Sequence, residues 1–117
     1  MNRAIEQAFT DFPIPVSFIV YGGHADAYVT YQQTDIDEVL HADDSVSEYK
    51  TYYDFDVYVK NNKRGNYYDY IAAIKEIMEN IGFMWEPTRD SGDMFEPDTQ
   101  YFHKTICFSY DVSLQNK

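Results

Sequence analysis

Two aspartates and a histidine are the side chains of this sequence with the clearest potential for chemistry. Asp54 and Asp56 lie two residues apart on a segment that alternates like a β-strand, so both carboxylates fall on one face. Paired carboxylates bind hard cations or act as acid and base in hydrolysis. A metal-dependent hydrolase would also need a third group, and His103 would have to supply it. Polar side chains are ordinary on the exposed face of an antiparallel sheet, and we favour that interpretation.

The single cysteine and the three histidines do not form a recognisable site. His24, His41 and His103 are far apart in the sequence, whereas zinc sites usually combine closely spaced cysteines and histidines. Cys107 and His103 share a strand face, but about 13 Å separates them along the strand, too far for a catalytic pair. We therefore expect no catalytic residue, no metal site and no cofactor.

The segment from Thr34 to Ser47 is rich in carboxylates and long for a connection in a small domain. It does not match a calcium-binding EF-hand loop, because Leu40 stands where that loop requires glycine. Its centre is apolar, which a solvated linker does not need and a protein partner would bury. We predict a mobile binding loop, whose candidate interface residues are Asp35, Asp37, Val39, Leu40, Asp43 and Asp44.

A second candidate interface is the one tight basic cluster, formed by Lys60, Lys63 and Arg64. The whole chain has 9 basic and 20 acidic residues and a net charge of −11. Nucleic acids and anionic membranes attract basic surfaces, so we expect neither as a direct partner. No run of the sequence approaches the roughly 18 apolar residues of a membrane span. The acidic segment and the basic cluster could instead orient identical subunits head to tail.

Periodicity predicts the elements that must position these residues. The helix at 67–81 should be capped by Asn66 and ended by Gly82. The strand at 48–60 should turn Phe55 and Val57 inward. The remaining expected elements are a helix at 1–9, a strand at 16–21, a Gly22-Gly23 turn, a strand at 27–33 that pairs back, a polar loop at 61–65, a short strand at 83–88, a loop at 89–99 and a strand at 100–112.

Together these elements predict one domain over 1–117 of the α+β class. We expect a mainly antiparallel sheet of about four to five strands, with two helices packed on one face. Aromatic residues make up 18% of the chain and 12 of them are tyrosines, a residue suited to both strands and protein interfaces. The composition thus favours a protein that binds or assembles.

Several segments carry a resemblance to a known family. They are Ile14-Pro15-Val16, Tyr28-Val29-Thr30-Tyr31, Tyr53-Asp54-Phe55-Asp56-Val57-Tyr58 before a polar loop and helix, and Tyr101-Phe102-His103-Lys104-Thr105-Ile106 after Ile81-Gly82-Phe83. This layout resembles the small neck proteins of long-tailed bacteriophages, the tail-terminator or tail-to-head joining family. The resemblance implies a structural subunit with no active site, which forms a hexameric ring on the tail tube and docks to the head. Its implied partners are the tail tube protein and the head-completion protein, in a virion assembled in the host cytoplasm.

Two other classes of function remain open from the sequence. A small acidic inhibitor that mimics DNA would spread its carboxylates regularly along one face, whereas here they concentrate in Asp35–Asp56 and Glu86–Asp98. A metal-dependent hydrolase would have to rely on Asp54, Asp56 and His103. The oligomeric state distinguishes these classes. We expect the assembly protein to form a ring, and an inhibitor or a hydrolase to be a monomer or a dimer.

Overall fold

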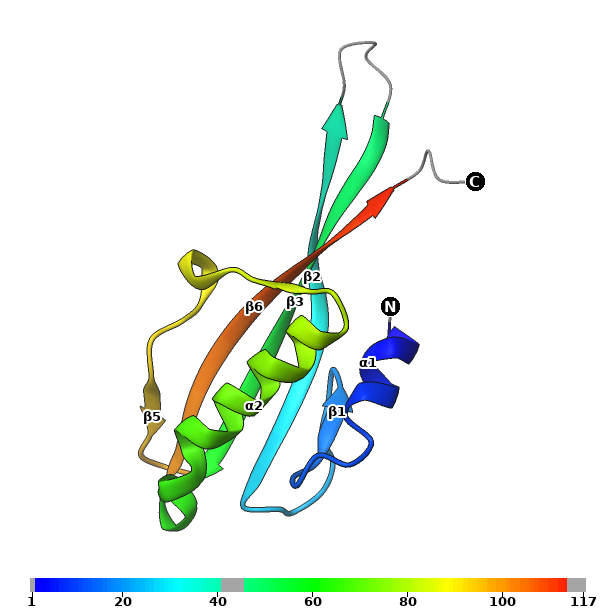
Figure 1. The fold of residues 1–117 in the computed structure, drawn as a ribbon. Helices are drawn as coiled ribbons and strands as arrows, with labels where there is room; N and C mark the ends of the chain where they lie inside the picture. The colour runs from blue at the N-terminus through cyan, green and yellow to red at the C-terminus, as the bar shows by residue number, and fades with distance from the viewer. Residues whose placement is uncertain (1, 41–45, 114–117) are drawn as a thin grey trace.

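A computed structural model describes residues 2–40 and 46–113, with side chains described for 3–38 and 49–112 (Figure 1). The elements follow in the order α1 (Asn2–Ala8), β1 (Val16–Phe18), β2 (Ala27–Leu40), β3 (Val46–Lys60), the 3₁₀ helix η1 (Asn61–Asn66), α2 (Tyr67–Asn80), β4 (Met84–Trp85), the 3₁₀ helix η2 (Pro87–Arg89), β5 (Met94–Glu96) and β6 (Tyr101–Ser113).

The described strands form a single six-stranded sheet in the order β1-β2-β3-β6-β4, and β5 also pairs with β6. Three long antiparallel strands, β2, β3 and β6, make up most of it. The α+β class and the two α-helices are confirmed, but the sheet has more strands than the predicted four to five.

The core lies between α2 and one face of the sheet. On β3, Phe55 and Val57 are fully buried, and Ile74 of α2 is fully buried against the same core. Ile5 of α1 and Phe9, which follows α1, join this cluster, and both helices cover one face of the sheet (Figure 1). The predicted packing of the 67–81 helix on this strand face is therefore confirmed.

The two ends of α2 differ from each other in how well the sequence predicted them. Gly82 has a φ of 98°, a conformation that favours glycine, and a Cβ there would lie 3.1 Å from the Tyr110 ring. This confirms glycine as the helix terminator. Asn66 occupies the N-cap position, but its side chain makes no capping hydrogen bond, so that part of the prediction was wrong.

The predicted loop from Thr34 to Ser47 is wrong for most of its length. β2 continues to Leu40 and β3 begins at Val46, and the two strands stay paired with a register shift between Gln33 and Asp35. The described side chains from Gln32 to Glu38 are all exposed, so this strand has no buried face and shows no inward-outward alternation. Asp43 and Asp44 lie outside the described residues, as do the side chains of Val39 and Leu40.

Four smaller corrections concern short elements. β1 runs parallel to β2, from Val16 opposite Val29 to Phe18 opposite Tyr31, instead of forming the predicted hairpin. The predicted polar loop at 61–65 is the 3₁₀ helix η1. The predicted loop at 89–99 contains β5, and the predicted strand at 83–88 is the short strand β4 followed by η2.

The molecule is elongated, with extents of 55 × 27 × 23 Å. Its radius of gyration is 16.0 Å, whereas a compact domain of 100 residues has about 13 Å. The end of β2 near Leu40 and the start of β3 near Val46 project beyond both helices (Figure 1). Among the described residues, no helix has the length and apolar character needed to cross a membrane.

Candidate functional site

The projecting end of the hairpin carries the predicted acidic interface, and we call residues 34–40 and 46–50 the acidic arm. Asp35, Asp37 and Glu38 lie on β2 and are exposed. Ile36 stands among them and is 52% exposed, although it is apolar. Exposed carboxylates gathered on one strand would steer the approach of a basic partner.

Some of the arm's charge is balanced within the chain. Arg89 lies 3.6 Å from a carboxylate oxygen of Asp35, and its guanidinium stacks 3.7 Å from the centre of the Tyr52 ring. Burial raises the pKa of Tyr52, and a hydrogen bond with Asp37 raises it further. The ion pair is exposed and therefore weak, so Asp35 remains available to a partner.

The predicted basic interface lies at the other end of the sheet, and we call Lys60, Lys63 and Arg64 the basic corner. η1 begins directly after β3 and presents Lys63 and Arg64 to solvent. The Arg64 guanidinium donates to the backbone oxygen of Asn61 at 3.1 Å and to its side-chain oxygen at 3.2 Å. Lys60 lies 5.9 Å from the Tyr101 ring centre. The corner is thus a fixed cationic surface beside a cavity of about 310 Å³.

The structure does not bring the two charged surfaces together within one subunit. Lys60 follows Val59, which pairs with Ala27 at the start of β2, whereas Asp35 lies eight residues further along β2. At about 3.3 Å per residue, the separation along the strand is roughly 26 Å at Asp35 and grows toward Leu40. The acidic arm and the basic corner therefore lie at opposite ends of the sheet, although Asp26 and Glu96 lie near the basic corner.

Asp54, Asp56 and His103 lie on the face of the sheet that the two α-helices leave open. His103 Nε2 lies 3.3 Å from Asp56 Oδ1, and the Thr105 hydroxyl donates to the same carboxylate oxygen. Burial alone would raise the pKa of Asp56, but the hydrogen bonds from His103 and Thr105 together hold it below its usual range. Among the described residues, no group of three or more His, Cys, Asp and Glu side chains could hold a metal ion. The carboxylate of Asp56 is thus engaged by its own sheet.

Cys107 lies beside Asp54 on that face and is 1% exposed. Burial, followed by repulsion from the Asp54 carboxylate, raises the pKa of the Cys107 thiol to about 12. A thiol must lose its proton to act as a nucleophile or a metal ligand. Cys107 is therefore a packing residue in this environment.

A row of stacked rings on the same face was not predicted from the sequence. Tyr21, Tyr28, Tyr58 and His103 stack in succession, with ring centres 4.6, 4.8 and 4.2 Å apart. Tyr28, Tyr58 and His103 lie on the neighbouring strands β2, β3 and β6, and their two stacking distances are close to the spacing of strands. Tyr21 extends the row from the segment between β1 and β2. The alternation of the strands places these residues outward, but only the register of β2, β3 and β6 brings them into one row.

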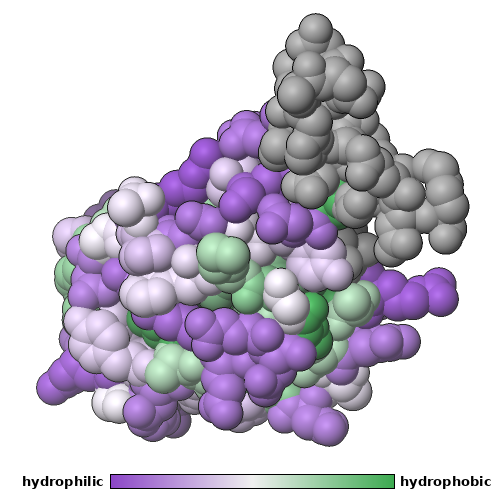
Figure 2. Space-filling model, turned by 45° about the horizontal axis from the view of Figure 1, so that its top comes forward, coloured by the Kyte–Doolittle hydropathy of each residue, from purple (hydrophilic) through white to green (hydrophobic). Residues whose placement is uncertain are grey.

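Apolar side chains also gather at the two edges of the sheet. At the β1 edge, Phe18, Ile19 and Val20 are 46%, 57% and 72% exposed. At the β5 edge, Met94 and Phe95 are 42% and 41% exposed. The face in Figure 2 shows apolar residues set among hydrophilic ones. The β1 and β5 edges lie on opposite sides of the subunit (Figure 1).

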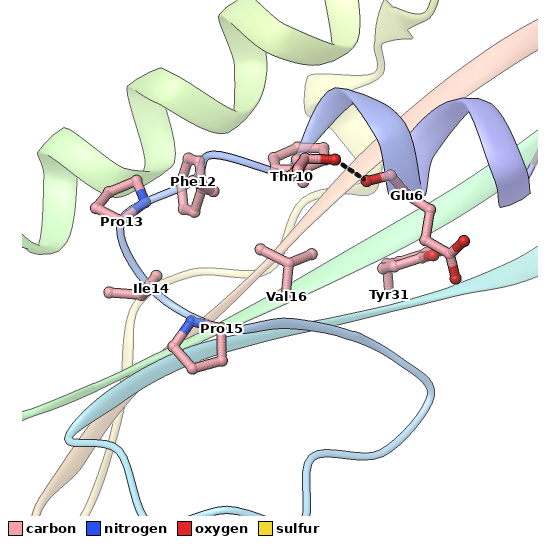
Figure 3. Close-up of a pocket in the computed structure, with 9 residues that line it drawn as sticks. Glu6, Thr10, Phe12, Pro13, Ile14, Pro15, Val16 and Tyr31 are labelled. Atoms are coloured by element: carbon pink, nitrogen blue, oxygen red, sulfur yellow. Dashed lines mark hydrogen bonds between the residues drawn. The ribbon is translucent and has the colours of Figure 1, made fainter.

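A cavity of about 410 Å³ lies between α1 and the β1 edge (Figure 3). Most of its lining residues belong to the segment that joins α1 to β1. Glu6 and Tyr31 also line it, and burial followed by the nearby Glu6 charge raises the pKa of Tyr31. The β1 edge therefore combines apolar side chains with an exposed carboxylate.

Comparison with known proteins gives no assignment: no protein-family model matches the chain, and no curated protein matches it in sequence.

Proposed function

We propose that this chain is a ring-forming subunit of the neck of a long-tailed bacteriophage, where six copies cap the tail tube and join the tail to the head. The observation that carries the proposal is the shape of the subunit together with its charge. The molecule is 55 Å long, and the acidic arm and the basic corner lie toward its opposite ends. A connector between two different structures needs two different contact surfaces facing opposite ways, and this arrangement supplies them.

The acidic arm and the basic corner are suited to the two axial partners, the tail tube protein and the head-completion protein. Identical copies that meet end to end form a closed ring only if the rotation between them closes, and otherwise form an open filament. The exposed apolar side chains at the two edges of the sheet offer a lateral contact between copies instead. We therefore assign the charged ends to axial partners and the sides of the subunit to its neighbours in the ring.

Asp90 and Asp93 form hydrogen bonds within the subunit, which supports an assembly function over mimicry of DNA. Asp90 accepts hydrogen bonds from the Trp85 ring and the Cys107 backbone, and Asp93 accepts from the hydroxyls of Tyr67 and Tyr68. A mimic of DNA has to present its carboxylates to the partner. These carboxylates instead hold the 86–93 segment and the start of α2 in place.

Asp56 and Cys107 also have structural roles, which supports a non-enzymatic function. Asp56 is held by His103 and Thr105, and the Cys107 thiol is buried in its protonated form. We propose that the protein acts in the virion, through protein contacts and without direct binding of nucleic acid or membrane.

Deletion of the gene in a phage that carries it tests this function. We expect filled heads and separate tails, some of irregular length, because the joining surface and the cap would both be lost. Expression of the chain in trans should restore joined particles. Intact, infectious particles from the deletion would refute the proposed function.

A further inference from the structure

We propose that neighbouring copies in the ring are held by an apolar knob at the β1 edge of one copy, seated in an aromatic socket at the β5 edge of the next. The knob consists of Phe18, Ile19 and Val20. The socket consists of Arg64, Tyr67, Tyr68, Asp93 and Phe102. This inference rests on the proposed function and names the contact through which the ring would close.

The knob is an unusual feature for an isolated subunit. Its three consecutive apolar side chains are all exposed, and Val20 is the most exposed of them at 72%. Ordinary soluble surfaces expose single apolar residues, whereas a contiguous group marks a contact surface. The knob lies at the outermost strand of the sheet, beyond which no described strand follows.

The backbone of the knob is held in a strained conformation. Ile19 has a φ of 69°, which is rare for a β-branched residue. The Val20 N–H donates to the Phe18 carbonyl at 2.8 Å across it, and the Ile19 N–H donates to the Tyr31 carbonyl at 2.9 Å. The first bond closes a three-residue γ-turn of the strained kind. Strain of this kind persists where it presents side chains for a function, and here it turns Ile19 and Val20 out toward solvent.

The socket is a preformed cavity of about 230 Å³ with largely aromatic walls. Tyr67 and Tyr68 each donate a hydroxyl hydrogen bond to one of the two carboxylate oxygens of Asp93. This fixes the Tyr68 ring, although the side chain is 65% exposed. Phe102 forms another wall, and the partly exposed ring of Phe95 packs on it with 4.8 Å between ring centres. A rigid apolar cavity suits the insertion of one or two aliphatic side chains.

A second copy of this chain is the occupant that fits both surfaces. The knob and the socket lie on opposite edges of the sheet, so one subunit cannot fill its own socket. Arg64 and Asp93 both line the socket, but the Asp93 carboxylate is engaged by the Tyr67 and Tyr68 hydroxyls and lies 3.9 Å from Lys104 Nζ, so Arg64 supplies the charge at the rim. The knob has Glu6 near it, since the Phe18 ring contacts Tyr31 and Tyr31 shares a cavity with Glu6. A knob-to-socket contact pairs opposite charges, whereas a knob-to-knob contact would bring two Glu6 carboxylates together. The contact is therefore head to tail, as ring closure requires.

Site-directed cross-linking of the full-length chain tests the contact. Two variants, Val20→Cys and Tyr68→Cys, are made with tags of different mass, mixed at high protein concentration and raised ionic strength, and treated with a short thiol-reactive cross-linker. The native Cys107 is 1% exposed and should not react. We expect the mixed pair to cross-link in preference to either variant alone. Met84→Cys is the matched control, because Met84 is apolar and 56% exposed but belongs to neither surface.

Light scattering on untagged chains provides an independent readout. Val20→Asp should raise the protein concentration needed for assembly by roughly tenfold or more, as the loss of one central contact residue does. Met84→Asp adds the same charge and should leave that concentration unchanged.

The results of these experiments distinguish the proposed knob-to-socket contact from the proposed function. Mixed cross-links above the Met84 control, together with the loss in Val20→Asp, support the contact. Assembly of the wild-type chain without these cross-links would overturn the knob and socket and leave the ring standing. A chain that stays monomeric at every concentration and ionic strength and is missing from virions would overturn both.

Discussion

Replacement of Asp90 by alanine should destabilise the subunit by opening one edge of β6. β4 pairs with β6 at Ser109 and Phe108, and β5 pairs with it from His103 to Tyr101. Between them, the side chain of Asp90 accepts the Cys107 N–H at 2.9 Å and the Trp85 Nε1–H at 2.8 Å. The carboxylate thus takes the place of a strand in a gap of the sheet.

The magnitude follows from these two bonds. A hydrogen bond to a charged group contributes about 1.5–3 kcal/mol, and a buried N–H left without a partner costs about 1–3 kcal/mol. Water can reach Trp85, which is partly exposed, but reaches Cys107 less easily because that residue is buried. We therefore expect Asp90→Ala to lower the free energy of unfolding by about 2–4 kcal/mol.

Asp90→Asn should lose roughly half as much. Its amide oxygen can still accept the Cys107 N–H, but its amide nitrogen would then face the Trp85 N–H, donor against donor. Asp98→Ala is the matched control, because it removes the same negative charge from an exposed side chain. Any stability gained by lowering the net charge of −11 is common to both alanine variants.

Urea unfolding followed by tryptophan fluorescence gives the free energies, and amide exchange reports on the Cys107 N–H directly. Trp85 is the single tryptophan, so its signal should be checked against circular dichroism, since Asp90 contacts it. If Asp90→Ala and Asp98→Ala unfold within about 0.5 kcal/mol of each other, the carboxylate does not seal the edge and the reasoning fails.

Three further outcomes follow from the described contacts. Ile74→Ala should lower the free energy of unfolding by about 2–5 kcal/mol, because Ile74 is fully buried between α2 and the sheet; a change within error in urea titrations would contradict its place in the core. The pKa of Asp56 lies below its usual 3.8, so the stability that the Asp56 carboxylate contributes is complete above pH 3.8 and is lost as the pH falls through the folded pKa. Asp56→Asn should therefore be less stable at pH 7, and its free energy of unfolding should fall less steeply as the solution is acidified. An unchanged dependence on acid pH would refute this linkage. Treatment with a chelator should leave the melting temperature unchanged, and a drop reversed by one particular cation would revive a carboxylate metal site.

The sequence predicted those elements that bury one face. On β3, the alternation of Phe55 and Val57 with polar residues reflects burial against α2, and Ile74 marks the matching helix stripe. The same logic failed for residues 34–40, because a strand exposed on both faces has no apolar period to detect. The strand at 34–40 could nevertheless have been inferred from β3, because the half of β3 that begins at Val46 requires a paired strand on its β2 side.

Other features depend on tertiary contacts that local pattern does not encode. Gly22-Gly23 suggested a hairpin, yet β1 ends at Phe18 and the chain returns to run parallel to it. β5 has three residues, none of them buried, and its pairing with β6 defines it. For the candidate site, sequence predicted the acidic and basic residues but not their positions at opposite ends of the sheet. Those positions follow from the length and register of β2 and β3.

Cryo-electron microscopy of purified virions tests the central proposal most directly. A density tag fused to the chain would locate it, and symmetry averaging would give its copy number. We predict one closed ring of six copies between the tail tube and the head, with the acidic arm toward one partner and the basic corner toward the other. Tagged virions that contain no such ring at this position, or a neck whose density is filled by other chains, would contradict the account.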